Sequence, residues 1–147
     1  MYQLAKLLMP NEAIILENQN ELTLLALCVW GEARGESESG RAAVAHVVMN
    51  RYRMQKAAYG VTVREVILKP FQFSCFNSRL ERGRKFMRDA RKCTAWEACV
   101  FVAWEAYLGI TNDPTDGATH YHSNSCSPEW AEELTKTVTI GNHIFYR

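Results

Sequence analysis

Apolar residues recur at the three- and four-residue spacing of helices along the first two thirds of the chain. The clearest row lies in residues 20–29, and Gly31 and Gly35 are expected to close this helix. A second helix is expected over residues 40–55, with Ser39 as its N-cap. The pattern therefore predicts two helices in succession before residue 56.

Further along, Thr62 is expected to cap a short helix that ends at Lys69–Pro70. Residues 71–83 mix aromatic and polar residues and are expected to be irregular. The longest helix is predicted over 85–108, where apolar positions keep a helical period until Gly109. Most of the chain is thus predicted to be helical.

After residue 112 the pattern changes to short alternating segments. Strands are expected at 118–122, 137–140 and 144–146, and a short helix at 11–18. No linker or repeat divides the sequence. We expect one mostly helical α+β domain with a small β element in the C-terminal third, formed by residues 21–147, and an N-terminal extension, residues 1–20, that packs on it.

Composition narrows the possible partners. The 147 residues include 17 Lys and Arg against 16 Asp and Glu, so no overall field favours nucleic acid. The longest apolar runs, Leu24–Trp30 and Ala98–Trp104, fall far short of the ~18 residues that span a membrane. The N-terminus has no secretory signal core, and five cysteines without a C-x-x-C pair do not suggest a disulfide framework. We expect a monomer made in a reducing cytosol, without stable membrane insertion.

Glu32 is the first candidate for catalysis. It continues the apolar row of Leu25 and Val29 near a helix C-terminus, where burial and the helix dipole are expected to raise the pKa of its carboxyl. A carboxyl kept protonated near neutral pH suits general-acid cleavage of a glycosidic bond. Glu36 would share this face if the helix continued. The alternative is two solvated acids on either side of Arg34.

Two other sets of residues are candidates for catalysis or for metal binding. Glu97 falls in an inward row of the long helix, as a second catalytic carboxyl or as half of an ion pair. His120, His122 and His143 would supply three zinc ligands, although the H-E-x-x-H signature is missing. The alternative for these histidines is ordinary hydrogen bonding.

Residues 79–92 carry seven Lys and Arg against two acidic residues. This charge excess is compatible with a solvated helix face or with attraction to an anionic polymer of the cell envelope.

Several sequence blocks resemble a known family. Trp-Gly-Glu-Ala-Arg-Gly-Glu at 30–36 and Gly-Arg-Ala-Ala-Val-Ala-His-Val-Val-Met-Asn-Arg at 40–51 resemble the opening of the SleB/CwlJ-type cell-wall hydrolases. That family includes the spore-cortex-lytic enzymes and a group of phage endolysins. Later blocks follow in the family's order at 66–74, 113–122 and 141–147.

The resemblance covers residues 21–147 and implies a lysozyme-like domain related to lytic transglycosylases. The implied substrate is the peptidoglycan glycan strand, cut between N-acetylmuramic acid and N-acetylglucosamine without a metal or other cofactor. The family's catalytic glutamate is the first acid of the Glu-Ala-Arg-Gly-Glu block, here Glu32. Glu32 would protonate the leaving oxygen and then act as base on the 6-hydroxyl of muramic acid, which leaves a 1,6-anhydro end.

The resemblance also suggests residues that hold the sugars or the developing charge. These substrate-binding candidates are Gln72, Ser74, Thr119, Tyr121 and His122. A bare catalytic domain without an export signal is expected to act as a phage endolysin, held in the host cytoplasm until a holin releases it to the cell wall. Three alternatives stay open: a muramidase that uses Glu36 or Glu97 with water, a zinc amidase acting on the stem peptide, and a non-catalytic glycan-binding domain.

Overall fold

The computed structural model describes residues 2–76 and 79–147, and for residues 79–82 it describes the backbone alone. Its helices are α1 (Tyr2–Leu7), α2 (Glu21–Ala33), α3 (Glu38–Arg53), α4 (Val63–Leu68), α5 (Arg79–Lys92) and α6 (Trp96–Leu108). Its strands are β1 (His120–Ser123), β2 (Lys136–Ile140) and β3 (His143–Tyr146). Single 3-10 turns occur at η1 (Leu16–Asn18), η2 (Ser74–Phe76) and η3 (Glu129–Glu132).

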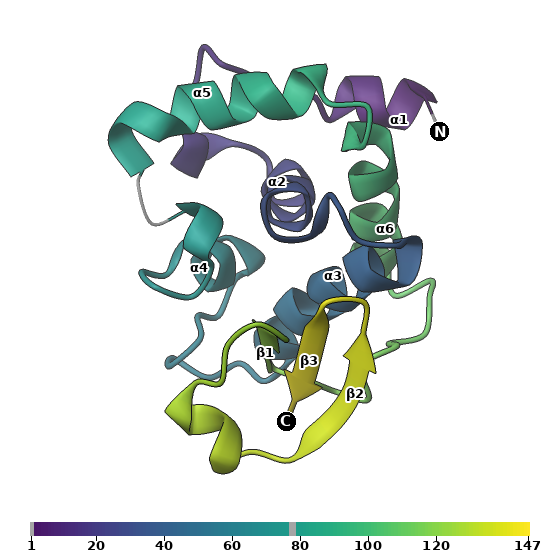
Figure 1. Ribbon diagram of the computed structural model, residues 1–147. Helices are drawn as coiled ribbons and strands as arrows, with labels where there is room; N and C mark the ends of the chain where they lie inside the picture. Colours follow the sequence, from purple (N-terminus) through teal and green to yellow (C-terminus); the bar gives the residue numbers. More distant parts are fainter. Residues whose placement is uncertain (1, 77–78) are drawn as a thin grey trace.

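Helix α2 lies at the centre, with α5, α6, α3 and α4 around it (Figure 1). Every residue of Leu24–Trp30 is at most 6% exposed. A helix that is apolar on all sides must be covered on all sides, so this run dictates a central position. Asn20 caps the helix by accepting a hydrogen bond from the Leu22 N–H, which confirms the predicted start.

The next two helices begin at polar caps. Helix α3 starts at Glu38, because Ser37 rather than Ser39 accepts the Gly40 N–H. The prediction of Ser39 as the cap is therefore wrong by two residues. Thr62 and Glu65 form a reciprocal capping box at the start of α4, which confirms the predicted cap.

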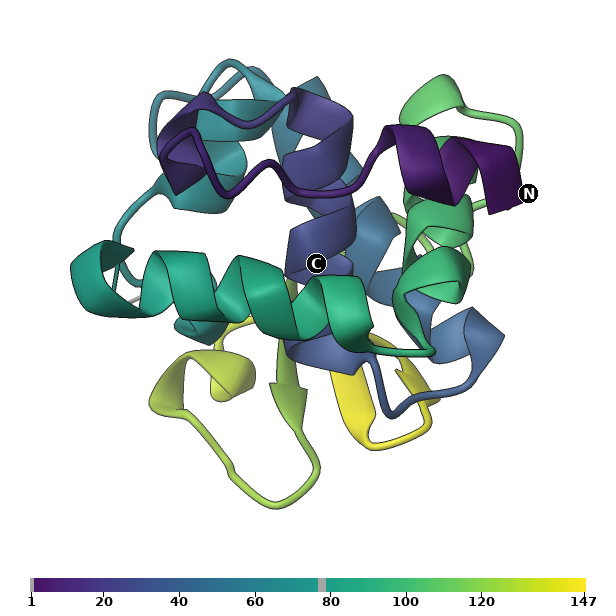
Figure 2. The same cartoon turned by 90° about the horizontal axis from the view of Figure 1, so that it is seen from above.

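The predicted helix over 85–108 is two helices. Helix α5 ends at Lys92 and α6 begins at Trp96, although neither Gly nor Pro marks the break. The turn lets α5 lie across α2 and α6 descend beside it, as Figure 2 shows from above. Trp96 is 2% exposed, and its indole N–H donates to the Ala5 carbonyl at 3.4 Å. Burial of Trp96 against α1 accompanies the change in direction.

The stretch 71–83, predicted to be irregular, contains η2 and the start of α5, so the irregular part is shorter than expected. Residues 77–78 of that stretch lie outside the described residues. The expected helix at 11–18 is reduced to the single turn η1.

The three strands form an antiparallel sheet in the order β1-β3-β2, which confirms a mostly helical single domain with a small β element near its C-terminus. Tyr121 is paired with Phe145, and His122 is paired with Ile144. Phe145 packs with Ala43 and Val47 of α3 in a small apolar cluster that joins the sheet to the helices. Within the described parts of the chain, no helix has the length and apolar character needed to cross a membrane.

Candidate active site

The carboxylate of Glu32, in the last turn of α2, is held by two segments distant from it in sequence. Its Oε1 atom accepts hydrogen bonds from the Ser74 hydroxyl at 3.1 Å and from the Cys75 backbone N–H at 3.0 Å. Its Oε2 atom accepts a hydrogen bond from the Tyr121 hydroxyl at 2.9 Å. Glu32 is half-buried and Ser74 is exposed. A carboxylate that is oriented and yet open to solvent can give or take a proton at one defined place.

Gly31 allows η2 to reach Glu32. A Cβ atom at position 31 would lie 2.6 Å from Cys75 Cβ and 2.9 Å from Phe86 Cζ, closer than real contacts allow. The expectation that Gly31 closes the helix is wrong, because α2 continues to Ala33. The missing side chain instead permits the close approach that brings the Cys75 N–H to the carboxylate.

Tyr121 is a neutral hydrogen-bond donor. Burial and the nearby charge of Glu32 raise the pKa of the Tyr121 hydroxyl well above its ordinary value. Its ring lies 5.6 Å from the ring of Phe145 and 5.0 Å from that of His143, measured between centroids. The sheet therefore fixes the direction of the hydroxyl toward Glu32.

Arg51 connects the two segments that supply these donors. Its Nε donates to the Thr119 carbonyl at 2.6 Å, and its Nη1 donates to Gln72 Oε1 at 3.0 Å. The side chain is 5% exposed, and its guanidinium lies over the rings of Tyr59 and Phe73. Burial lowers the pKa of Arg51 from its ordinary value. One buried cation thus fixes η2 and β1 relative to each other.

Glu36 lies beyond the end of α2 and is bound to the turn between β2 and β3. Its carboxylate accepts hydrogen bonds from Asn142 Nδ2 at 3.0 Å and from the Asn142 backbone N–H at 3.2 Å. These bonds lower the pKa of Glu36 below its ordinary value. Because α2 ends at Ala33, the two acids do not share a helix face, and Glu36 does not act on Glu32 in the way expected from a continuing helix.

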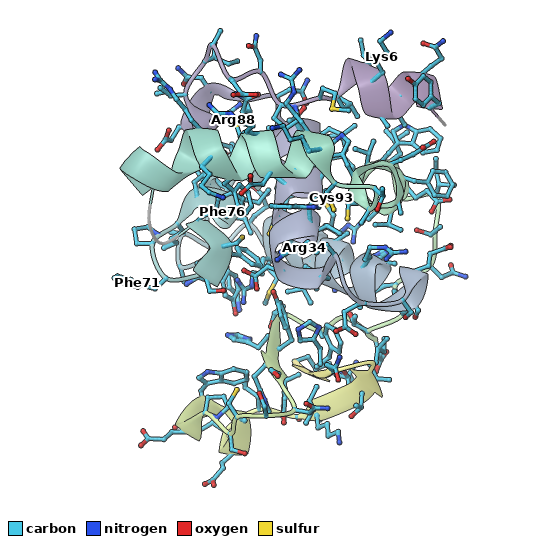
Figure 3. The ribbon with its side chains drawn as sticks, turned by 45° about the horizontal axis from the view of Figure 1, so that its top comes forward. Lys6, Arg34, Phe71, Phe76, Arg88 and Cys93 are labelled. Carbon is cyan, nitrogen blue, oxygen red and sulfur yellow. The ribbon has the colours of Figure 1, made fainter. Side chains whose placement is uncertain are left out.

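Arg34 does not bridge these acids. Its guanidinium lies 4.8 Å from the ring centroid of Trp30, at the end of α2 in Figure 3.

Glu97 is half-buried on α6 in a different part of the molecule. It lines a pocket of about 430 Å³ together with Tyr2, Lys6 and Arg91. This pocket lies among α1, the end of α5 and the start of α6, whereas the partners of Glu32 come from η2 and β1. The structure does not bring the two carboxyls together.

The three histidines considered as zinc ligands lie on opposite faces of the sheet. His120 and His122 share one face of β1, whereas His143 packs against Tyr121 on the other. Both ring nitrogens of His122 have partners, the Ser123 carbonyl at 2.8 Å and the Tyr146 hydroxyl at 3.0 Å. Among the side chains of residues 2–76 and 83–147, no three His, Cys, Asp or Glu are grouped as metal ligands would be.

The basic segment 79–92 forms α5, and part of its charge is compensated. Arg88 and Arg91 pair with Glu12 at 3.1 Å and 3.7 Å, and Lys85 pairs with Asp89 at 2.5 Å. Because Glu12 lies outside residues 79–92, its two ion pairs compensate part of the positive charge excess that was counted within the segment. The side chains of Arg79 and Arg82 lie outside the described part of the structure.

Among the predicted substrate-binding residues, Ser74 and Tyr121 contact Glu32, whereas Gln72 and Thr119 contact Arg51. His122 lies on the face of β1 away from Glu32. Sequence reasoning missed Arg51 and Cys75. Arg51 follows Val44 and Val47 in the buried row of α3, so a charge in an apolar row was the available signal. Cys75 acts through its backbone N–H, for which its side chain gives no signal.

Comparison with known proteins identifies relatives over most of the chain. The profile of a family described as Cell Wall Hydrolase matches residues 35–146. The matched region begins three residues after Glu32. Spore cortex-lytic enzymes of Oceanobacillus iheyensis and Bacillus subtilis are 32% and 30% identical to this chain over 131 residues, 87% of its length. Those residues make up 42% and 38% of the two relatives, so the chain spans less than half of each.

Two solved structures share the fold. The catalytic domain of the Bacillus cereus SleB protein superimposes with a TM-score of 0.67 at 30% identity, covering 88% of this chain and 91% of that domain. The catalytic domain of the germination-specific lytic transglycosylase SleB from Bacillus anthracis gives a TM-score of 0.66 at 29% identity, covering 88% and 96%.

Proposed function

Because this chain belongs to the cell wall hydrolase family, we propose that it degrades peptidoglycan as a lytic transglycosylase, with Glu32 as its single acid and base. The observation that carries the proposal is the half-exposed Glu32 carboxylate, which accepts three hydrogen bonds from two separate segments. The catalytic unit is residues 21–147, on which residues 1–20 pack. The bond cleaved joins N-acetylmuramic acid to N-acetylglucosamine.

The three donors suit a proton-transfer role. When Glu32 gives its proton to the glycosidic oxygen, a negative charge develops on the carboxylate. Ser74, the Cys75 N–H and Tyr121 already point at that charge, so it is stabilised without rearrangement. The carboxylate then takes a proton from the 6-hydroxyl of the muramic acid, whose oxygen attacks the anomeric carbon of the same sugar. Because the attack is intramolecular, the nucleophile needs no water and no second carboxylate.

The placement of the other acids supports this route. The Glu36 carboxylate is engaged by Asn142, and Glu97 lines a pocket beside α1. Ser74 and Tyr121 orient the reacting carboxyl. Gln72 and Thr119, held by Arg51, fix the segments on either side of it.

The test is product analysis of purified sacculi digested with the protein. Mass spectrometry is expected to find muropeptides that end in 1,6-anhydromuramic acid, and the Glu32→Gln variant is expected to release at least about 10²-fold fewer of them. Reducing muramic acid ends would show hydrolysis by water and contradict the transglycosylase step. Intact glycan with freed stem peptides would contradict both the bond and the residue.

The finer proposal is that this chain acts as a monomeric phage endolysin in host cell lysis. It rests on the resemblance of its sequence blocks to a family that includes phage endolysins. Expression in a bacterial cytoplasm, with and without a co-expressed holin, tests it: culture lysis is expected only with the holin. Lysis that does not depend on the holin would contradict the proposal.

A further inference from the structure

Phe71 occupies a backbone position that favours glycine. The Lys69 carbonyl accepts a hydrogen bond from the Gln72 N–H at 3.2 Å, and Pro70 and Phe71 form the centre of this turn. Phe71 has a φ angle of +64°. Proline followed by a residue of positive φ is the pattern of a type II turn, whose third position prefers glycine because a side chain is strained there. The local backbone therefore does not account for phenylalanine.

Packing does not account for it either. Phe71 is 87% exposed, whereas its neighbours Phe73 and Phe76 are 2% and 3% exposed. Figure 3 shows Phe71 projecting outward at the edge of the molecule, while Phe76 points inward beneath α5. A strained and exposed aromatic ring gains nothing from the fold, so an interaction outside the chain is its natural explanation.

The ring is close to the Glu32 site and firmly attached to it. Phe71 precedes Ser74 by three residues, so their Cα atoms are at most about 11 Å apart. Ser74 donates to Glu32, and Gln72 is held by the buried Arg51. A strand of a few sugar rings whose reacting bond lies at Glu32 is therefore long enough to reach Phe71, away from the bond that breaks.

We propose that Phe71 is a stacking platform for a sugar ring of the bound glycan strand. The inference rests on the proposed function and adds a substrate-binding residue to it. One face of a pyranose ring consists of C–H groups, which pack against the electron-rich face of an aromatic ring. Contact far from the reacting bond strengthens binding of long strands and leaves the chemical step unchanged.

Three substitutions separate stacking from simple apolar contact. Phe71→Gly removes the ring and relieves the turn, Phe71→Leu keeps apolar bulk without a π face, and Phe71→Trp keeps the π face. In a Glu32→Gln background, which holds substrate without cutting it, sedimentation with purified sacculi measures binding. We expect about tenfold weaker binding for the Gly and Leu variants, as for loss of one well-placed contact, and retained binding for Trp.

The same substitutions in the active enzyme give the kinetic test. Phe71→Gly is expected to raise KM for long glycan strands about tenfold and to leave kcat within about twofold. Its melting temperature is expected to equal or exceed that of the wild type, because the turn prefers glycine. Ile15→Gly removes another exposed apolar side chain, 56% exposed and outside the segments that contact Glu32, and is expected to leave KM unchanged.

Two outcomes overturn the inference while the proposed function stands: wild-type binding and KM in Phe71→Gly, or a melting temperature lower than that of the wild type. A failure of the proposed function looks different, because the wild-type protein would then release no anhydromuropeptides. The sedimentation assay would still decide whether Phe71 contributes to glycan binding, since it requires no turnover.

Discussion

Glu32 and Glu36 lie four residues apart, and each carboxylate accepts hydrogen bonds from segments far away in sequence. Glu32, in the last turn of α2, is held by Ser74, Cys75 and Tyr121. Glu36, beyond the end of that helix, is held by Asn142 alone. The donors to Glu32 come from two sides of an open site, whereas Asn142 ties a loop to a β turn.

The difference shows that the position where α2 ends, more than the four-residue spacing of the two acids, determines where each carboxylate lies. Had α2 continued for one more turn, Glu36 would have faced the same side as Glu32. The helix ends at Ala33, so the chain turns away and Glu36 becomes an anchor between the α2–α3 connection and the sheet. Equal residue type and helical spacing thus do not imply a shared site.

The largest predicted effect comes from replacing each acid by its amide. Glu32→Gln is expected to lower the turnover of sacculi by about 10²–10⁴-fold, the usual contribution of a general acid and base. Glu36→Gln is expected to keep turnover within about twofold, because the Glu36 carboxylate is engaged by Asn142 and has no part in the proposed reaction. Release of soluble muropeptides measures both.

Thermal unfolding provides the control for this pair. Glu32→Gln is expected to unfold near the wild-type temperature, since the amide oxygen still accepts hydrogen bonds. Strong loss of turnover in Glu36→Gln with unchanged unfolding would place that acid in the reaction and remove the contrast between the two.

The next largest effect is expected at Gly31. An alanine Cβ there would collide with Cys75 and Phe86, pushing η2 and its donors away from Glu32. A displacement of about 1 Å at a reacting group lowers turnover about 10²-fold, and Gly31→Ala is expected to show a loss of that order. Gly35→Ala is the matched control, because no atom lies within 4 Å of a Cβ at that position. Equal activity in the two variants would disprove the close-approach role.

The position of Glu32 near a helix end could be predicted because the signal is local, whereas its catalytic role stays a prediction. Its place in an apolar row near a helix end is visible from spacing alone, and the predicted cap at Thr62 is likewise a local feature of the sequence. Tyr121 and Ser74 were singled out through the resemblance, but which atoms they contact depends on the sheet and on η2. These hydrogen bonds join residues 42 and 89 positions apart in the sequence, so they are set by tertiary packing.

The predictions that failed concern places where tertiary packing overrides a continuous pattern. Residues 85–108 keep a helical period across the break between α5 and α6, because each half has its own apolar face. A straight helix of that length would measure about 36 Å, whereas the observed break lets α5 and α6 both pack against α2. The turn at Phe71 lies in the stretch predicted to be irregular, but its positive φ could not be predicted, since a phenylalanine gives no signal of it.

A smaller effect is expected from Tyr121→Phe. The change removes one of the three donors to Glu32 and keeps the ring that packs on Phe145. Loss of one hydrogen bond to a charged group costs about 1.5–3 kcal/mol. Turnover is expected to fall by about tenfold, the lower end of that range, because two of the three donors remain. Tyr146→Phe, on the opposite sheet face, is the control and is expected to leave turnover unchanged. A similar loss in both variants would point to a general effect of the sheet.

The smallest predicted effect is the acid dependence of stability that Glu36 contributes. Its pKa in the folded protein is lowered by Asn142 from the ordinary value of 4.5, so the folded state prefers the ionised form. The stabilisation is therefore complete above the ordinary pKa and is lost as the pH falls through the lower, folded-state pKa. At neutral pH it is expected to reach at most about 1 kcal/mol, because Glu36 is partly exposed.

The measurement is the free energy of unfolding of the wild type and of Glu36→Gln between neutral pH and pH 3. The difference between the two proteins is expected to shrink as the solution becomes more acidic. The pKa of Asp113 is also lowered, because hydrogen bonds from Thr115, Asn50 and Gly117 outweigh the effect of its burial. Asp113 is present in both proteins, so its contribution cancels from the difference. If the difference in free energy of unfolding stayed constant with pH, the contacts with Asn142 would not depend on the charge of Glu36. Glu36 would then no longer be a charged anchor that contrasts with Glu32.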